Sequence, residues 1–315
     1  MTAPRFAYLF PGQGSQNPGM GQALAEAYPA AREVFERADA ALGRPLSRLC
    51  FEGSAEDLAL TENTQPSVLA VDVAALRTLE THGLRPVAAA GHSLGEYAAL
   101  VIAGVLGFED ALRAVCVRAS LMQEAGEQHP GTMAAIIGLS DEAVRTICEA
   151  ASTEEDRVCP ANFNAPGQVV VSGTIPAVHR AMEQAKEAGA KLAVKLSVSG
   201  AFHSPLMDSV GRKMEEALSG IAFSPAQIPI VDNVTADVVR DPDKIRDLLI
   251  QQLTHPVLWV ASMQKLVAMG IGTVIEVGPG KVLQGLMRRI DRSVRTLGAD
   301  RAEEVRNTVE NSGSS

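Results

Sequence analysis

The segment Gly91-His92-Ser93-Leu94-Gly95 lies between an apolar run and a helical pattern, and it constrains the fold more than any other feature. The run Val87–Ala90 predicts a buried strand, and Leu94–Ala103 predicts a helix. A strand that turns sharply into a helix through glycines and one serine is typical of an α/β fold. We therefore expect a mostly parallel sheet with helices packed on it.

The rest of the chain repeats this alternation. Apolar runs at Phe6–Phe10, Ile228–Asp232 and Thr273–Val277 predict further strands, and helical patterns such as Pro66–His82 and Phe108–Gly126 separate them. Strands that alternate with helices pair mostly in parallel, because the connecting helices cover the faces of the sheet. This pattern supports an α/β architecture with a mostly parallel sheet for the larger part of the chain.

Residues 130–197 show a different order of predicted strands and helices. Their pattern is strand, helix, strand, strand, helix, strand, which is the order of a ferredoxin-like motif. We therefore predict a small ferredoxin-like subdomain at 130–197, inserted into a large α/β subdomain formed by residues 1–129 and 198–310. The polar residues 311–315 predict a disordered tail.

Composition excludes several classes of protein. Hydrophobic residues make up 46% and charged residues 21% of the 315, which fits a globular chain, and the net charge of −9 argues against nucleic acid or anionic membrane as a partner. The longest strongly apolar stretch, near Ala98–Gly107, is too short to span a bilayer, and no signal-like segment begins the chain, so we expect a cytoplasmic protein. The four cysteines form no C-x-x-C pair, so we expect no metal site and no disulfide framework.

Ser93 is the candidate nucleophile. The G-x-S-x-G pattern after a strand exposes the serine hydroxyl at a tight turn, and the helix that follows presents backbone N–H groups, that of Leu94 first, to a developing oxyanion. The alternative is a glycine-flanked serine that only caps the helix.

A serine nucleophile needs a base, and His203 is the best of the six histidines. It precedes Ser204-Pro205, a plausible start of a helix, and a helix N-terminus favours the neutral imidazole that accepts a proton. The alternative is a structural histidine in a turn. The other histidines are interpreted as surface, loop or turn residues: His82, His92, His129, His179 and His255.

Arg118 and the loop Pro11–Gln16 complete the candidate site. Arg118 lies on the apolar stripe of its helix, where an unpaired guanidinium is costly, so it must meet a carboxylate of the protein or of a ligand. An internal salt bridge or an extended side chain that reaches solvent is the alternative. The loop follows the first strand, where α/β folds bind ligands, and the N–H of Gln13 is placed to donate to an oxyanion; a simple tight turn is the alternative.

Taken together, the motifs resemble the malonyl-coenzyme A:acyl carrier protein transacylase family, which includes free-standing acyltransferases of polyketide assembly lines. The resemblance runs from about Phe6 to Leu297. The motifs occur in family order: Phe10–Gln16, Thr64-Gln65-Pro66, Gly91–Tyr97, Arg118 in its helix, Asn162–Gln168, Gly200–Ser204, Gln252-Leu253 with Pro256-Val257, and Glu276–Gly280. The family implies an α/β-hydrolase-like large subdomain and a ferredoxin-like small one, which agrees with the order of elements predicted above.

The resemblance also implies a role for each catalytic position. Ser93 matches the nucleophile and His203 the base, and the backbone N–H groups of Gln13 and Leu94 match the oxyanion hole. Gln252 matches a residue whose backbone carbonyl orients the histidine in place of a triad aspartate.

Four further residues match substrate-binding positions. Arg118 is similar to the arginine that holds the malonyl carboxylate, and His92 and Asn162 line or shape the pocket. Phe202 resembles the position at which malonyl-selective members carry phenylalanine and methylmalonyl users carry serine.

The implied activity is transfer of a malonyl group from malonyl-coenzyme A to the phosphopantetheine thiol of an acyl carrier protein, in trans, through a malonyl-serine intermediate. No metal or redox cofactor is implied. Two other interpretations stay open: a serine esterase or thioesterase, and a non-catalytic module that docks carrier proteins.

An acidic carrier protein needs a local basic patch on this acidic chain. Two clusters are available. One is formed by Lys191 and Lys195, and the other by Lys281, Arg288, Arg289 and Arg292.

Overall fold

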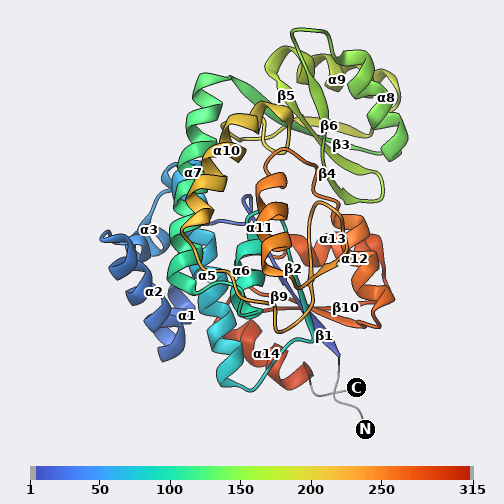
Figure 1. The fold of residues 1–315 in the computed structure, drawn as a ribbon. Helices are drawn as coiled ribbons and strands as arrows, with labels where there is room; N and C mark the ends of the chain where they lie inside the picture. Colours follow the sequence, from blue (N-terminus) through green and yellow to red (C-terminus); the bar gives the residue numbers. More distant parts are fainter. Residues whose placement is uncertain (1–4, 313–315) are drawn as a thin grey trace.

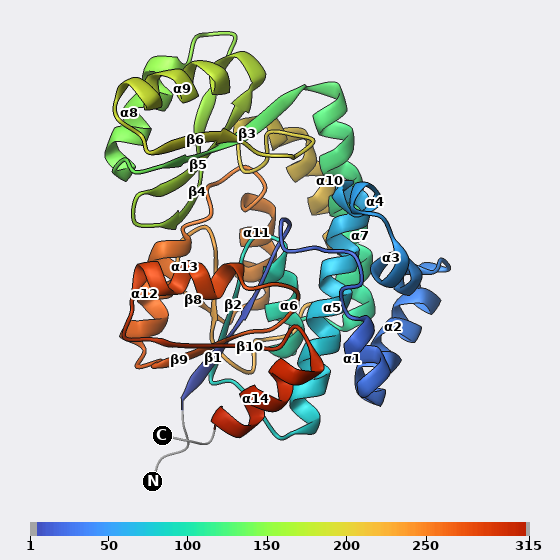
Figure 2. The ribbon, with the colours of Figure 1, turned by 180° about the vertical axis from the view of Figure 1, so that it is seen from behind.

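The computed structural model describes residues 5–312 and contains two sheets, each with its own helices (Figures 1 and 2). The larger sheet has six strands in the order β10-β9-β1-β2-β7-β8, and all neighbours are parallel except β7 and β8. Its strands are β1 (Phe6–Phe10), β2 (Ala88–Gly91), β7 (Ile230–Val231), β8 (Val238–Val239), β9 (Thr273–Glu276) and β10 (Arg295–Gly298). The predicted mostly parallel α/β sheet is confirmed.

Alternate residues of the central strands face two separate cores. Tyr8 and Phe10 of β1 pack on the side of α5 (Thr61–Thr81), α6 (Gly95–Ile102) and α7 (Phe108–Gln128). Ala7 and Leu9 pack on the opposite side, which α12 (Trp259–Ala268) and α13 (Val282–Ile290) cover. A strand buried on both faces has to be apolar throughout, and this is why the run at β1 could be recognised in the sequence.

The register of the central strands places the functional turns together. Phe10, the last residue of β1, lies opposite Gly91, the last residue of β2. Parallel strands end at the same edge of the sheet, so the loop after Phe10 and the turn after Gly91 meet there, as the switch-point rule for α/β folds requires.

The smaller sheet is antiparallel, with the order β4-β5-β3-β6. Its elements are β3 (Gly131–Ile137), α8 (Asp141–Ala151), β4 (Val158–Ala165), β5 (Gln168–Thr174), α9 (Ile175–Glu187) and β6 (Leu192–Lys195). This is the ferredoxin-like order, and both helices lie on the face away from the large sheet (Figure 1). Ser140 caps α8, because its hydroxyl accepts a hydrogen bond from the N–H of Ala143 at 3.2 Å.

The small subdomain is attached to the large one along two of its edges. The chain crosses between them at residues 128–131 and again at 196–201, and a Cβ on Gly126 of α7 would lie 2.2 Å from the carbonyl oxygen of Ser199. On the far edge, Val257 donates to Ala161 at 2.8 Å and accepts from Phe163 at 2.9 Å. Backbone contacts therefore fix both sides of the interface.

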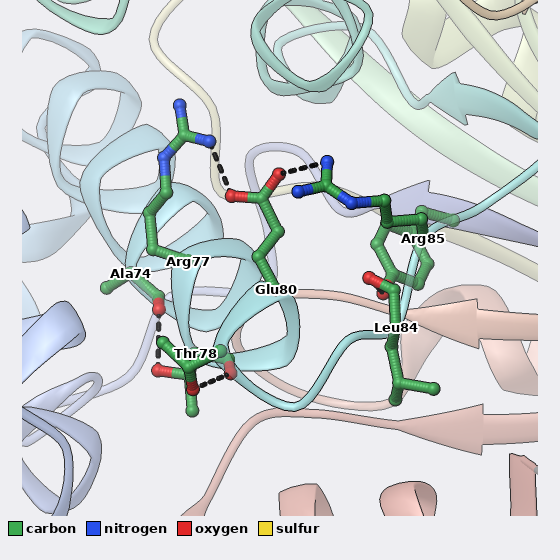
Figure 3. A network of polar contacts seen from close by, with 8 residues as sticks. Ala74, Arg77, Thr78, Glu80, Leu84 and Arg85 are labelled. Carbon is green, nitrogen blue, oxygen red and sulfur yellow. Dashed lines mark hydrogen bonds and ion pairs between the residues drawn. The ribbon is translucent and has the colours of Figure 1, made fainter.

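The end of α5 is fixed by a small polar network (Figure 3). Glu80 lies between two arginines, 2.5 Å from Arg77 and 3.7 Å from Arg85, and Thr78 donates to Ala74 at 2.9 Å. The hydroxyl of Tyr8 donates to the carbonyl of Leu84 at 3.1 Å. These bonds hold the segment that leads into β2, the strand that precedes the turn with Ser93.

Several elements differ from the sequence prediction. The helix expected from Pro205 is a 3-10 turn, η1 (Pro205–Met207), followed by α10 (Asp208–Ser219). The remaining helices had no assigned pattern: α1 (Gln22–Ala27), α2 (Pro29–Leu42), α3 (Leu46–Glu52), α4 (Ala55–Ala59), α11 (Pro242–Gln251) and α14 (Ala302–Ser312).

The tail predicted at 311–315 is wrong in its first two residues. Asn311 and Ser312 form the end of α14, where Asn311 donates to Asn307 at 2.7 Å and accepts from Arg295 at 3.0 Å. These bonds replace the apolar packing that the polar sequence lacks. Residues 313–315 lie outside the described part of the chain.

Within the described residues no helix is both long enough and apolar enough to cross a membrane.

Candidate active site

Ser93 occupies a strained turn between β2 and α6. Its φ is 52°, in the left-handed region that a residue with a side chain rarely adopts. The flanking glycines are needed because the backbone is crowded: a Cβ on Gly91 would lie 2.0 Å from the backbone of Gly95, and one on Gly95 would lie 2.1 Å from the carbonyl oxygen of Phe10. This geometry is that of a nucleophile turn rather than of an ordinary helix cap.

Asn233 holds this turn in place, and the sequence analysis missed it. Its Oδ1 accepts from the N–H of Ser93 at 2.7 Å, and its Nδ2 donates to the carbonyl of Gly91 at 2.7 Å. Asn233 is fully buried and follows β7 at the same edge of the sheet. Its position after a predicted strand was the one available signal.

His203 lies beside the serine. Its Nε2 is 2.8 Å from Ser93 Oγ, and its Nδ1 is 2.7 Å from the backbone carbonyl oxygen of Gln252. A carbonyl only accepts, so Nδ1 carries the proton and Nε2 is left to accept the proton of the serine. The structure thus brings together the three residues in the arrangement that the resemblance implied.

Burial keeps His203 neutral. The side chain is buried, and desolvation together with the charge of Arg118 lowers the pKa of His203 to about 3. The sequence argument expected a neutral imidazole from a helix N-terminus, whereas burial is the main cause.

Gln252 also connects the candidate catalytic groups through its side chain. Its Oε1 accepts from Arg118 at 3.0 Å, and its Nε2 donates to the carbonyl of Ser93 at 3.0 Å and to Glu96 Oε2 at 2.6 Å. Burial and the charge of Asp232 raise the pKa of Glu96 to about 8. Glu96 was quoted only as part of a motif, and the structure makes it the anchor of Gln252.

Arg118 is 1% exposed and has only neutral acceptors. Its guanidinium donates to Gln65 Oε1 at 2.7 Å, to Gln252 Oε1, and to Ser93 Oγ at 3.1 Å. Among the described residues no carboxylate lies within ion-pair distance, and its Nε has no partner. A buried guanidinium whose charge is not neutralised by the chain is suited to bind an anion beside Ser93.

The pocket in front of these groups has a volume of about 150 Å³. Every predicted site residue except Gln252 lines it: Gln13, His92, Ser93, Leu94, Arg118, Asn162, Phe202 and His203. Gln65, Met122, Met133, Asn164, Val170, Leu196 and Val198 complete the wall. The small subdomain therefore supplies part of a pocket whose candidate nucleophile, Ser93, belongs to the large one.

The predicted oxyanion donors lie at the edge where β1 and β2 end. No residue in the range 5–312 accepts a hydrogen bond from the N–H of Gln13 or of Leu94. The loop bearing Gln13 packs closely on the turn, because a Cβ on Gly12 would lie 2.4 Å from the carbonyl oxygen of His92. Two free N–H groups beside Ser93 are what an oxyanion hole requires.

His92 belongs to the wall and does not serve as a base in this arrangement. Its Nε2 is 2.7 Å from Asn164 Oδ1, and its ring centroid is 5.2 Å from that of Trp259. Desolvation lowers the pKa of His92, so the ring is neutral. Asn162 is buried in the same wall.

In the described part of the chain, no three His, Cys, Asp or Glu side chains are arranged to hold a metal ion.

Comparison with known proteins gives the family. The model of the acyl transferase domain matches residues 7–307. The chain belongs to the acyl transferase domain family. It is 46% identical to the malonyl CoA-acyl carrier protein transacylase of Bacillus subtilis, over 96% of this chain and 95% of that protein. It is also 46% identical to the enzyme of the same name from Escherichia coli K12, over 95% and 96%.

Solved structures of family members superpose on the whole chain. The malonyl CoA-acyl carrier protein transacylase of Coxiella burnetii has a TM-score of 0.96 at 39% identity, covering 99% of this chain and 98% of its own. A malonyl-transacylase in complex with a type II PKS acyl-carrier protein has a TM-score of 0.95 at 41% identity, covering 98% and 99%. The family resemblance and the two-subdomain acyl transferase fold are thereby confirmed.

Proposed function

We propose that this protein transfers a malonyl group from malonyl-coenzyme A to the phosphopantetheine thiol of an acyl carrier protein, through a malonyl ester of Ser93. The observation that carries the proposal is Arg118, a buried cation that no carboxylate of the described chain neutralises, 3.1 Å from the hydroxyl of the nucleophile. A malonyl group brings the missing carboxylate to that place. Two relatives that are 46% identical over at least 95% of both chains carry the corresponding name.

The first half-reaction forms the ester. His203 Nε2 takes the proton of Ser93 Oγ, and the oxygen attacks the thioester carbonyl of malonyl-coenzyme A. The oxyanion that develops accepts from the N–H groups of Gln13 and Leu94. When the carbon–sulfur bond breaks, the proton on Nε2 goes to the sulfur, and coenzyme A leaves as a thiol.

The second half-reaction reverses these steps with a different thiol. His203 takes the proton of the phosphopantetheine thiol, the sulfur attacks the malonyl ester, and the proton then returns to Ser93 as the carbon–oxygen bond breaks. A neutral base is needed in both halves, and the depressed pKa of His203 maintains it throughout the neutral range.

Arg118 holds the acyl group between the two halves. A guanidinium presents two parallel N–H donors to a carboxylate, and such a pair is strong and directional when it is buried, as Arg118 is. The same contact keeps the ester carbonyl at the oxyanion donors while one thiol leaves and the other enters. These steps require a serine, a base and proton transfer, and no metal or redox cofactor.

The cognate carrier acts in trans in this proposal, in the cytoplasm. Of the two basic clusters, the one at Lys281 is partly engaged, because Lys281 pairs with Glu304 at 2.5 Å and Arg289 donates to Gln168. Lys191 and Lys195 have no ion pair within residues 5–312, which favours them as the docking cluster. Their charge reversal is expected to raise the KM for carrier protein and to leave acylation by malonyl-coenzyme A unchanged.

One experiment separates this function from the alternatives. Malonyl-coenzyme A labelled in the malonyl group is mixed with enzyme and holo-carrier protein, and the label is followed. Label on the carrier supports transfer, free malonate indicates a thioesterase, and a protein that never becomes labelled would be a docking module.

A further inference from the structure

A second cavity lies behind the catalytic histidine. Its volume is about 740 Å³, which exceeds that of the pocket at Ser93. Its walls come from α8, from β4 and β5, and from residues 204–206, which follow His203. Proteins bind small organic ligands in cavities of about 300–1,000 Å³, so this one is large enough for a ligand of its own.

The interior of the cavity is apolar. Val158, Pro160 and Leu206 line it together with Cys148 and Cys159. Burial raises the pKa of Cys148 to about 12 and of Cys159 to about 11, so both thiols are neutral and act as small apolar groups. Such a wall favours an alkyl chain over a polar ligand.

Cationic and polar groups accompany this apolar wall. Arg145 and Arg157 are exposed at the rim, and neither has an ion-pair partner in the described range. Arg145 is held in place over the ring of Phe163, with its guanidinium carbon 4.6 Å from the ring centroid. Glu149 lies on the same rim, so the two arginines and this carboxylate together carry a net charge of +1. Ser172, also in the lining, has a buried hydroxyl without a partner.

We propose that this cavity binds an anionic amphiphile, with its alkyl chain inside and its carboxylate at Arg145 and Arg157. Both parts of the ligand are required by the lining. The chain removes apolar wall from water, and the head group supplies the negative charge that the two arginines lack. Medium-chain fatty carboxylates have this chemistry.

The cavity is physically connected to the catalytic base. Cys159 Sγ lies 4.0 Å from the backbone oxygen of His203, and Ser204–Leu206 form one of the walls. His203 itself has a φ of 56°, a backbone conformation that depends on its surroundings. A ligand that displaces this wall changes the 2.8 Å contact of His203 with Ser93, so occupancy lowers kcat. This coupling rests on the proposed acyl transfer, whereas the binding does not.

Binding is tested by calorimetric titration with octanoate. We expect saturable binding to the wild-type protein and at least about tenfold weaker binding to the double variant Arg145→Glu/Arg157→Glu, since tenfold corresponds to the loss of one modest charged contact. The matched control is Lys186→Glu, which reverses the charge of an exposed residue of α9 in the same subdomain. This variant should bind octanoate as the wild type does. 1-Octanol, which lacks the carboxylate, should bind weakly, and its affinity should be the same for the wild type and the double variant.

Coupling is tested by steady-state malonyl transfer with octanoate present. We expect kcat to fall while the KM for malonyl-coenzyme A stays constant, and the double variant to resist the effect. If octanoate competed with malonyl-coenzyme A, it would bind at Ser93 and the proposal would be overturned. Equal affinity of octanoate for the wild type and the double variant at Arg145 and Arg157 would overturn it too. Absence of saturable binding would overturn it as well, whether or not the protein proves to transfer malonyl groups. Binding without any change in kcat would remove the coupling alone.

Discussion

Two buried polar regions lie at the same edge of the large sheet, and they are built in opposite ways. The side chains of Ser93, Arg118 and His203 are joined by hydrogen bonds, and Arg118 Nε is the one polar atom of these three described side chains without a partner. Beside the turn after β9, Asp72 is fully buried, and neither of its carboxylate oxygens has a hydrogen-bond partner among the described residues. Burial is common to both regions, so burial alone does not identify a site.

The acidic region also shows a close fit of backbone and side chain. A Cβ on Gly278 would lie 1.9 Å from Asp72 Oδ1, so only glycine fits there. Nearby Glu276 accepts from the N–H groups of Leu283 and Gln284 at 2.9 and 3.0 Å, at the start of α13. Burial, and secondly the charge of Glu276, raises the pKa of Asp72. What distinguishes the catalytic region is therefore convergence of donors and acceptors on one open point, Ser93 Oγ.

The largest effect is expected from the catalytic region itself. Ser93→Ala should abolish the malonyl-enzyme adduct, and His203→Ala should slow its formation by about three orders of magnitude or more, because each group acts in both half-reactions. Intact-protein mass spectrometry after mixing with malonyl-coenzyme A measures the adduct. A normal adduct on Ser93→Ala would refute the assignment of the nucleophile.

Arg118 is expected to give the next largest effect. Arg118→Ala should reduce kcat/KM for malonyl transfer about tenfold to a hundredfold more than for acetyl transfer, because acetyl has no carboxylate to lose. Parallel assays with the two coenzyme A thioesters provide the ratio. If both rates fell by the same factor, Arg118 would be a structural residue like those of the acidic region.

Phe202 tests whether shape adds to the polar contacts of the pocket. Its ring lines the wall next to His203, and Phe202→Ser should raise methylmalonyl use relative to malonyl by about tenfold, because one methyl group changes discrimination by about 1–3 kcal/mol. The ratio of the two kcat/KM values is the measurement. An unchanged ratio would assign selectivity to other wall residues.

Asp72 should affect stability and not catalysis. Its pKa is higher in the folded state than in the unfolded state, so the folded state retains the proton and loses stability as pH rises above about 4, the unfolded value. Asp72→Asn keeps the shape and removes the titration. We expect it to raise the free energy of unfolding by about 1–2 kcal/mol at pH 8, less at pH 5, in urea titrations. A loss of acyl transfer in a stable Asp72→Asn protein would make the acidic region part of the site.

The two regions also differ in how well their residues could be predicted from the sequence. Ser93 and Gln13 could be placed because each follows an apolar strand, and strand ends of a parallel sheet meet at one edge. Arg118 could be singled out because a cation on an apolar stripe needs a partner. Asp72, an acidic residue within the apolar run of α5, is a signal of the same kind, and the sequence analysis did not use it.

The support of the site was harder to predict. Asn233 follows a strand of only two residues, and Gln252 ends α11, a helix that the sequence analysis did not assign. The hydrogen bonds between Gln252, Glu96 and Arg118 join segments more than a hundred residues apart, and such contacts are set by packing rather than by local pattern. The large cavity behind His203 is equally a product of packing between elements.

The attachment of the small subdomain along two edges has a consequence for what can reach Ser93. The crossing at 196–201 closes one side, and the backbone bonds of Val257 to Ala161 and Phe163 close the other. A subdomain attached along one edge could rotate away to admit a bulky substrate. A subdomain attached along two edges cannot, so only a group that fits the existing opening reaches Ser93. The flexibility needed for binding must then come from the substrate. The part of the substrate that enters has to be narrow and able to bend, while its bulky part stays outside the pocket. A thioester at the tip of a long, thin, rotatable arm meets that requirement, whether the arm ends in a nucleotide or in a folded protein.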